Sequence, residues 1–295
     1  MEVSIMIEQQ YLEKYKRDLA LKGYSPRTQR TYYLSLVHFF RYFNEPPESI
    51  TKESIKDYLY HLIHVKKLSP STLRQAHSSI SYFFSQTMSR PMEVENIPCP
   101  KKITRLPDVF TPDEVFRIIR SAVNPKHMAM LMLAYSSGLR VGELVNLKVS
   151  DICRKTMRIK IRQAKGGKDR LVIMSAFCLK FLESYWKTYR PSDWLFPGIK
   201  QGAPLSTRAA QHAYNIAKRK AGITKKGGIH ALRHSFATHM LETGSGIFQL
   251  QKFLGHKHIK TTLVYVHITE ENIIARSPLD VYAGTSTHEL FHNCQ

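Results

Sequence analysis

The chain has 295 residues, of which 43% are hydrophobic, enough to build two domains with separate cores. Lysine and arginine number 44 against 23 aspartates and glutamates, a formal net charge of +21. Self-repulsion from such a surplus opposes folding, so the composition favours a polyanionic partner, above all a nucleic acid. Residues 1–106 hold 16 basic and 10 acidic side chains and the remainder 28 and 13, which excludes one charged tail as the source.

The four cysteines show no C-x-x-C spacing, so neither a disulfide framework nor a zinc knuckle is predicted. The first residues lack the basic-then-apolar order of a secretion signal. No apolar run approaches the roughly 18 residues needed to cross a bilayer. We therefore expect a cytoplasmic protein that does not use a membrane.

The first hundred residues predict a bundle of four short helices. Residues 8–23 place apolar side chains near helical spacing, from Tyr11 to Leu21, and Gly23 ends that helix. Residues 24–43 and 68–87 each carry Ser-Pro at their second and third positions, an N-cap followed by proline at the first helical position. Each then gathers aromatic residues, which we expect to form core rather than a base-stacking surface. Residues 51–65 supply the remaining amphipathic helix.

Four prolines and the absence of periodicity predict an inter-domain linker at residues 91–110. The linker separates an N-terminal helical domain, residues 1–90, from a second domain, residues 111–282, and residues 283–295 form a C-terminal tail. The second domain opens with the capping-box pattern T-P-D-E at residues 111–114.

The second domain mixes structure types. An apolar helix closes at Gly138. Residues 154–174 then alternate Met157, Ile159 and Ile161 with basic residues and turn at Gly166-Gly167, which predicts a β-hairpin with one basic face. Helices return from Ser206 onward.

The segment SSGLRVGELVNL places Arg140 just after a helix-ending glycine in apolar surroundings. Arginine is rarely buried without an anionic partner. Glu143 could supply that partner as an internal salt bridge. Alternatively, Glu143 orients the guanidinium from behind so that it can bind a phosphate.

The segment GIHALRHSFATHM places His230 and Arg233 three residues apart, on one face of a helix. The histidines lack the H-E-x-x-H spacing of a zinc helix, and Arg233 would repel a cation. A helix N-terminus that presents one histidine and one arginine to an anion fits better. We expect His234 and His239 to pack or to hydrogen-bond structurally.

The segment LGHKHIKTTLVYVHI, residues 254–268, raises three possibilities: a metal site, ordinary core, or a reactive tyrosine, Tyr265. Together with GLRVGEL and HALRHSFATHM, it resembles the three signature boxes of the tyrosine recombinase/integrase family. The order is Arg, His-x-x-Arg, Gly-His, and a tyrosine nine residues after that histidine. The resemblance spans about residues 8–282, so we interpret the segment as a phosphate site in which His258 and His267 are bystanders.

The resemblance implies a mainly α fold with a small β-hairpin or sheet. The N-terminal bundle would be a SAM-like core-binding domain, and the second domain an α+β tyrosine-recombinase catalytic domain. Simple bacterial recombinases that resolve chromosome dimers are the nearest general type. The later segment ARSPLD, residues 275–280, is similar to endings of integron integrases.

The resemblance also implies a chemistry without metal, cofactor or ATP. Tyr265 would attack a phosphodiester and form a 3′-phosphotyrosyl link. Arg140 and Arg233 would hold the phosphate oxygens, and His256 would donate to another of them. His230 would accept the tyrosine proton or orient the site.

The leaving 5′-oxygen needs a proton. Lys165 lies at the hairpin turn, where the resemblance places a mobile general-acid lysine, and Lys168 is its close competitor. A lysine beside glycines is otherwise only a solvated turn charge.

The expected partners are double-stranded DNA with paired recombination sites and a homotetramer in the synaptic complex. A C-terminal segment near residues 269–282 either docks on a neighbouring protomer or folds back on its own domain. The competing functions are a type IB topoisomerase, a catalytically silent DNA-binding protein of the same fold, and a metal-dependent nuclease built on the histidines.

Overall fold

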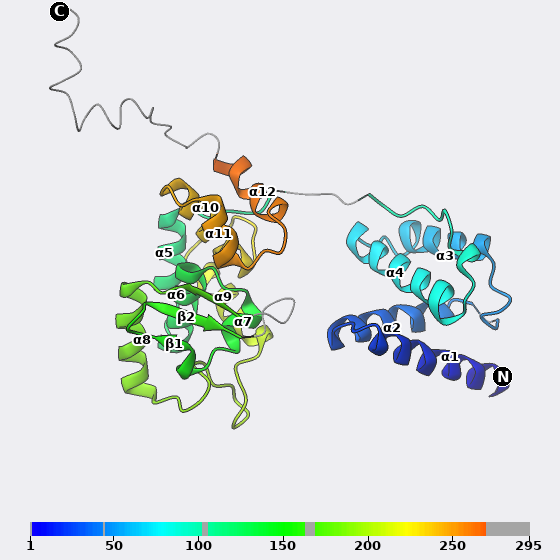
Figure 1. The fold of residues 1–295 in the computed structure, drawn as a ribbon, viewed down its shortest axis with the longest axis horizontal. Helices are drawn as coiled ribbons and strands as arrows, with labels where there is room; N and C mark the ends of the chain where they lie inside the picture. The colour runs from blue at the N-terminus through cyan, green and yellow to red at the C-terminus, as the bar shows by residue number, and fades with distance from the viewer. Residues whose placement is uncertain (1, 44, 102–105, 163–168, 270–295) are drawn as a thin grey trace, which may run out of the picture. The chain divides into compact units, whose positions relative to one another are not determined.

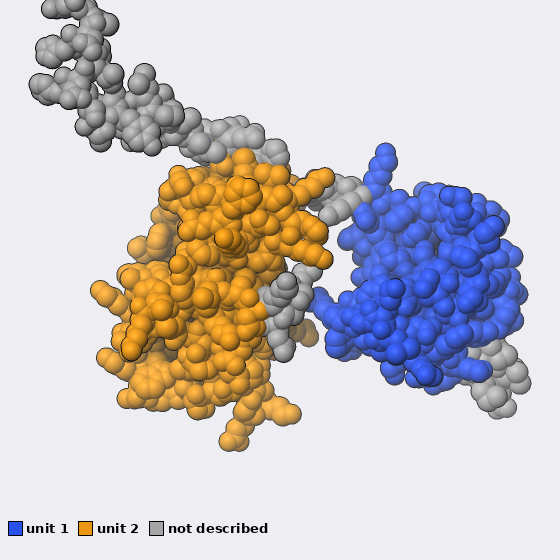
Figure 2. Space-filling view, viewed as in Figure 1, with its two compact units in different colours: residues 1–105 blue, residues 106–295 orange. Residues whose placement is uncertain are grey.

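The computed structural model describes residues 2–43, 45–101, 106–162 and 169–269 (Figure 1). The chain divides into two compact units, residues 1–105 and 106–295 (Figure 2). Each unit has its own hydrophobic core. Among the described residues, no helix is both long and apolar enough to span a membrane.

The first unit is the predicted four-helix bundle. Its helices are α1 (Glu2–Leu21), α2 (Pro26–Phe40), α3 (Lys52–His64) and α4 (Pro70–Tyr82), and α4 runs on into a π-helical turn, η1 (Phe83–Thr87). The two serine caps are confirmed. The Ser25 hydroxyl accepts from the Thr28 N–H at 3.2 Å, and that of Ser69 from Thr72 at 3.3 Å. Local capping therefore sets where α2 and α4 begin.

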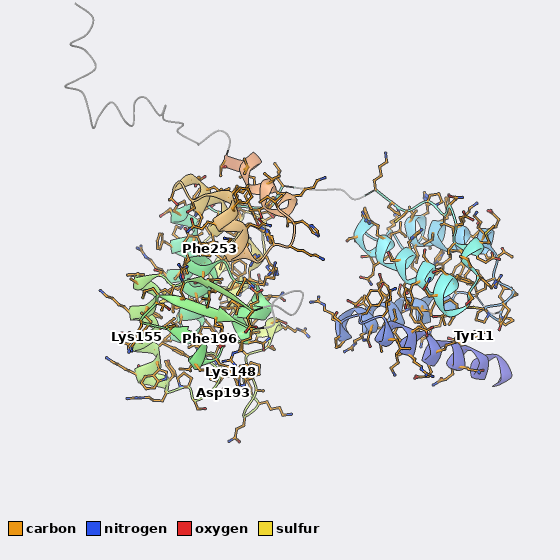
Figure 3. The ribbon with its side chains drawn as sticks, in the orientation of Figure 1. Tyr11, Lys148, Lys155, Asp193, Phe196 and Phe253 are labelled. Atoms are coloured by element: carbon orange, nitrogen blue, oxygen red, sulfur yellow. The ribbon has the colours of Figure 1, made fainter. Side chains whose placement is uncertain are left out.

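Aromatic side chains form much of the core of the first unit, as predicted. Tyr15, Phe39, Phe83 and Phe84 are fully buried. Leu21 lies in the first helix, as predicted, but is 77% exposed, because it is only two residues from the buried Leu19 and so points to another side of α1. The hydroxyl of Tyr11, a residue labelled in Figure 3, donates a hydrogen bond to the carboxylate of Glu48.

The expected linker is partly structured at both ends. A short 3-10 helix, η2, covers Pro91–Glu93, and Ile97 packs into the core of the first unit. Phe110 is fully buried in the core of the second unit, where its N–H donates to the Ser235 hydroxyl at 2.9 Å.

The second unit carries eight described α-helices and one 3-10 turn, η3 (Val149–Asp151). The α-helices are α5 (Pro112–Arg120), α6 (Pro125–Ser137), α7 (Val141–Val145), α8 (Ala176–Tyr189), α9 (Thr207–Lys220), α10 (His230–Glu242), α11 (Ile247–Leu254) and α12 (Lys260–Thr269). The capping box at Thr111 and Glu114 is confirmed. Helix α8 was not predicted.

A small antiparallel sheet, β1 (Ile152–Cys153), β2 (Arg158–Ile161) and β3 (Arg170–Ile173), completes the second unit. Strands β2 and β3 confirm the predicted hairpin, in which Ile159 pairs with Val172 on the buried face. The predicted Gly166-Gly167 turn lies outside the described residues. Met157 was wrongly included in the strand alternation: it precedes β2 and has φ +51.

Helices α10, α11 and α12 gather in one part of the second unit (Figure 1). A small apolar cluster joins them, made of Phe236, Ala237, Leu250, Leu254 and Tyr265. Helix α11 also contacts β3. Its Phe253, labelled in Figure 3, lies 5.7 Å from the guanidinium of Arg158 on β2. Helices α10, α11 and α12 and strand β3 therefore lie next to one another, and side chains at the start of α7 reach the same region.

Candidate active site

The carboxylate of Glu143 is held by two arginines. Arg140, the residue before α7, donates its backbone N–H and its Nη1 to the two carboxylate oxygens, each at 2.9 Å. Arg170 on β3 donates Nη1 and Nη2 to the same two oxygens, both at 2.8 Å. Burial alone would raise the pKa of Glu143, but the hydrogen bonds and charge of Arg170, with the bonds from Arg140, lower it to about 2. Glu143 is therefore ionised and fixes both guanidinium groups.

Arg233 on α10 is 4% exposed and lies between two helix ends. Its Nη1 donates to the Gly138 carbonyl and its Nη2 to the Leu254 carbonyl, each at 2.6 Å. Gly138 caps the C-terminus of α6 and Leu254 ends α11, so both partial negative charges favour a cation here. Nη1 of Arg233 is also 3.9 Å from a carboxylate oxygen of Glu143. Burial and the charge of Arg140 lower the pKa of Arg233 to about 9, which leaves it charged at neutral pH.

His256 follows Gly255, which ends α11 in the left-handed conformation with φ +60. Its Nε2 lies 3.2 Å from Arg233 Nη2 and its Nδ1 lies 3.0 Å from the hydroxyl of Thr262. Burial, followed by the charges of Arg233 and Arg140, lowers the pKa of His256 to about 4. The ring is therefore neutral at physiological pH.

Tyr265 on α12 is 4% exposed. Its hydroxyl lies 2.9 Å from His234 Nδ1, and its ring lies parallel to that of His256, with centroids 6.4 Å apart and planes 10° apart. Burial raises the pKa of Tyr265 above its ordinary value, and the charges of Arg233 and Arg140 offset only part of that rise. The phenol thus lies within the electrostatic field of both arginines while its hydroxyl bonds to a histidine.

His230 is the first residue of α10, one turn before Arg233. Loss of hydration, then the charges of Arg233 and Arg140, lowers the pKa of His230. It therefore lies in the same electrostatic field as Tyr265.

Five of the six predicted catalytic residues come together: Arg140, His230, Arg233, His256 and Tyr265. The sixth, Lys165, and its competitor Lys168 lie outside the described residues. The C-terminal docking segment beyond residue 269 and the side chain of His267 lie outside them too. His258 is exposed.

Two residues of this site were not recognised from the sequence. Arg170 lies in the predicted hairpin segment without being singled out there; it follows the same alternation as Val172 and faces inward, opposite Ile161. That alternation was a usable signal. His234 was expected to pack or hydrogen-bond structurally, and its partner is the hydroxyl of Tyr265. Only the tertiary structure shows that pairing.

The balance of charge suits an anion. Arg140, Arg170 and Arg233 surround the single carboxylate of Glu143, and the side chain of Arg140 is still 26% exposed. Within the described part of the chain, no three histidine, cysteine, aspartate or glutamate side chains group as metal ligands would. Fixed guanidinium groups beside a buried phenol are suited to holding phosphate oxygens next to a nucleophile.

Comparisons with known proteins identify the family of the chain. The model of the phage integrase family matches residues 108–272, and that of the N-terminal SAM-like domain of phage integrases matches residues 11–94. A Sinorhizobium fredii protein named as an integrase/recombinase is 35% identical, over 90% of this chain and 86% of its own length. Tyrosine recombinase XerA of Pyrococcus horikoshii is 33% identical, over 91% and 92%.

A solved structure of a lambda integrase tetramer bound to a Holliday junction shares the fold. It has a TM-score of 0.72 and 22% identity, covering 87% of this chain and 76% of that one. The resemblance seen in the three sequence boxes and the predicted fold class are both confirmed. The chain belongs to the phage integrase family and is a tyrosine recombinase.

Proposed function

We propose that the protein is a site-specific DNA recombinase that cuts and rejoins strands through a 3′-phosphotyrosyl intermediate. The observation that carries the proposal is the buried phenol of Tyr265 in the electrostatic field of Arg233 and Arg140, whose charges offset part of the rise in its pKa that burial causes. A phenol beside fixed positive charges can attack phosphorus without a metal ion or ATP.

In this mechanism the Tyr265 oxygen forms a bond to phosphorus while the bond from phosphorus to the 5′-oxygen breaks. Arg140 and Arg233 hold the oxygens that gain negative charge, and Glu143 keeps Arg140 in place through its 2.9 Å bonds. His256 donates to another phosphate oxygen, and His230 accepts the phenol proton or orients the site. Lys165 protonates the leaving 5′-oxygen. Rejoining reverses these steps with a new 5′-hydroxyl.

The proposed partners are double-stranded DNA with paired recombination sites and a homotetramer in the synaptic complex. The net charge of +21 supports a polyanionic partner. The lambda integrase tetramer on a Holliday junction, which shares the fold, supports the assembly.

A suicide substrate tests the proposal. It is a duplex with a nick beside the cleavage position, so that the 5′-hydroxyl fragment diffuses away and the covalent adduct accumulates. The recombination site comes from inverted repeats in the DNA that flanks the gene. Wild-type protein should form the adduct, and Tyr265→Phe should abolish it. Tyr135→Phe is the matched control, because that half-buried hydroxyl also bonds a histidine of α10, His239, at 2.8 Å.

The rival functions predict other outcomes. A silent DNA-binding protein forms no adduct. A metal-dependent nuclease loses activity in EDTA and leaves an unlinked phosphate. A type IB topoisomerase forms the adduct and relaxes supercoils but does not exchange strands between two sites.

A further inference from the structure

His256 is in a protonation state that the phosphate-donor role cannot use. A guanidinium group has only donors, so Arg233 Nη2, at 3.2 Å, must donate to Nε2 of His256. Nε2 therefore carries no proton. The ring proton lies on Nδ1, which donates to the Thr262 hydroxyl at 3.0 Å. The lowered pKa of His256 agrees with a neutral ring.

A phosphate oxygen offers only acceptors, so Nε2 must carry a proton to bind it. One proton then leaves Nδ1 for solvent and one arrives at Nε2 from solvent, and the ring stays neutral. Nδ1, which faces the fully buried Thr262, now needs a donor. A threonine hydroxyl can accept in one state and donate in the other.

We propose that Thr262 is a positioning residue that lets His256 change its tautomer. In the first tautomer, Nε2 of His256 accepts from Arg233; in the second, Nε2 donates to the scissile phosphate, and the Thr262 hydroxyl bonds to Nδ1 in both. The inference rests on the proposed function, since it assumes that His256 binds phosphate. The Nη2–H of Arg233 no longer donates to Nε2 of His256 in the second tautomer, so it can donate to the phosphate as well.

The placement of Thr262 supports this role. Thr262 is fully buried, so bulk water cannot replace His256 as the hydrogen-bond partner of its hydroxyl. It also lies three residues before Tyr265 on α12, and residues at that spacing share a helix face. One helix therefore carries both the nucleophile and the group that orients His256. A shift of α12 that moves Tyr265 towards phosphorus also moves the partner of the imidazole.

The test measures the rate of adduct formation on the suicide substrate. Thr262→Val keeps the shape but removes the hydroxyl, and we expect a rate lower by about tenfold to a hundredfold, because Nδ1 of His256 loses its hydrogen-bond partner. Thr262→Ser restores the hydroxyl and should stay within about threefold of wild type. Thr269→Val is the matched control, because Thr269 is equally buried on α12 and, among the described residues, its hydroxyl donates to the backbone carbonyls of Tyr265 and Val266 rather than to a side chain.

A second measurement separates positioning from general damage. In a His256→Ala background, Thr262→Val should cause little further loss, because the residue through which it acts is gone. Should Thr262→Val fail to fold, judged by thermal unfolding, Thr262→Ala replaces it in the same comparison.

Three results would overturn the inference: a wild-type rate in the folded Thr262→Val protein, no recovery with Thr262→Ser, or the full loss persisting in the His256→Ala background. The wild-type protein and Tyr265→Phe are run alongside. If wild type forms no adduct, or Tyr265→Phe still forms it, the proposed function itself is wrong, and the inference fails with it. If both behave as proposed, the Thr262 comparison decides the inference alone.

Discussion

At the scale of single residues, Glu143 is what allows three arginines to lie together. Its carboxylate oxygens accept two hydrogen bonds from Arg140 and two from Arg170. Arg170 also donates its Nε to the Phe253 carbonyl at 3.0 Å, so it joins β3 both to α7 and to α11. Removing one member of a buried ion pair leaves the others without compensation.

We expect Arg170→Met to lower the free energy of unfolding by about 3–5 kcal/mol, because Glu143 and Arg140 are left partly buried and unevenly paired. Arg154→Met is the matched control. Arg154 pairs with Glu183 at 2.8 Å, but its side chain is 71% exposed, and we expect a change of at most about 1 kcal/mol. Urea unfolding followed by tryptophan fluorescence measures both. Equal effects would contradict the central place of Arg170 in the site.

Residue identity in the site was predictable where a motif fixes it. The three sequence boxes identified Arg140, His230, Arg233, His256 and Tyr265, all of which lie in the one site. Hydrogen-bond partners were not predictable. Which histidine of α10 faces the phenol, and which threonine faces His256, depends on how α10, α11 and α12 pack, and no local rule sets that packing.

At the scale of elements, helix ends build the site. Gly138 ends α6 with φ +62, and its own carbonyl accepts from Arg233. Gly255 ends α11 with φ +60, and the ring of the next residue, His256, contacts Arg233. A Cβ on Gly138 would lie 2.3 Å from the Phe236 ring, and a Cβ on Gly255 would lie 2.8 Å from Arg170 Cδ. Both positions therefore need glycine for backbone conformation and for space.

We expect Gly138→Ala to lower the free energy of unfolding by about 2–4 kcal/mol, since left-handed strain adds to a clash with a buried ring. Gly244→Ala is the control: Gly244 has φ +86 but nothing within 4 Å of the added Cβ, so only strain of about 1 kcal/mol is expected. Thermal unfolding compares the two variants. A loss in Gly138→Ala no larger than in Gly244→Ala would show that the contact with Phe236 does not matter.

Elements with strong end signals were predicted well. The caps at Ser25, Ser69 and Thr111 and the glycine at the end of α6 all hold. Helix α8 and the two-residue strand β1 were missed. Strand β1 is too short for any alternation to show, and its existence depends on pairing with β2.

At the scale of the whole molecule, burial lowers the pKa values of several histidines, and nearby positive charge lowers those of all but His239 further. The pKa values of His234 and His256 are lowered to about 4, and those of His127, His230 and His239 are lowered too. All five belong to the second unit, which also holds both tryptophans, Trp186 and Trp194. Tryptophan fluorescence therefore reports on the unit in which these histidines lie.

We expect the second unit to lose stability as the pH falls from about 6.5 to about 4. Above this window His234 and His256 are neutral in both the folded and the unfolded chain. Within it the unfolded chain binds protons that the folded site excludes, so the free energy of unfolding falls. Because solvent screens both partly exposed imidazoles, we expect a fall on the order of 2 kcal/mol between pH 7 and pH 5, about half of what two fully shielded groups would give.

Urea titrations at pH 7 and pH 5, followed by tryptophan fluorescence, measure this change. His256→Gln should reduce the dependence on pH, whereas His258→Gln, which alters an exposed histidine, should not. Equal stability at the two pH values would contradict the account of these buried imidazoles.

The most direct test of the central claim locates the covalent bond itself. Wild-type protein is trapped on the suicide duplex, digested with a protease and a nuclease, and the remaining nucleotide is assigned to a peptide by mass spectrometry. We predict a nucleotide joined through its 3′-phosphate to Tyr265, and a free 5′-hydroxyl on the released strand. A nucleotide on any other side chain, or a released 5′-phosphate, would contradict the claim.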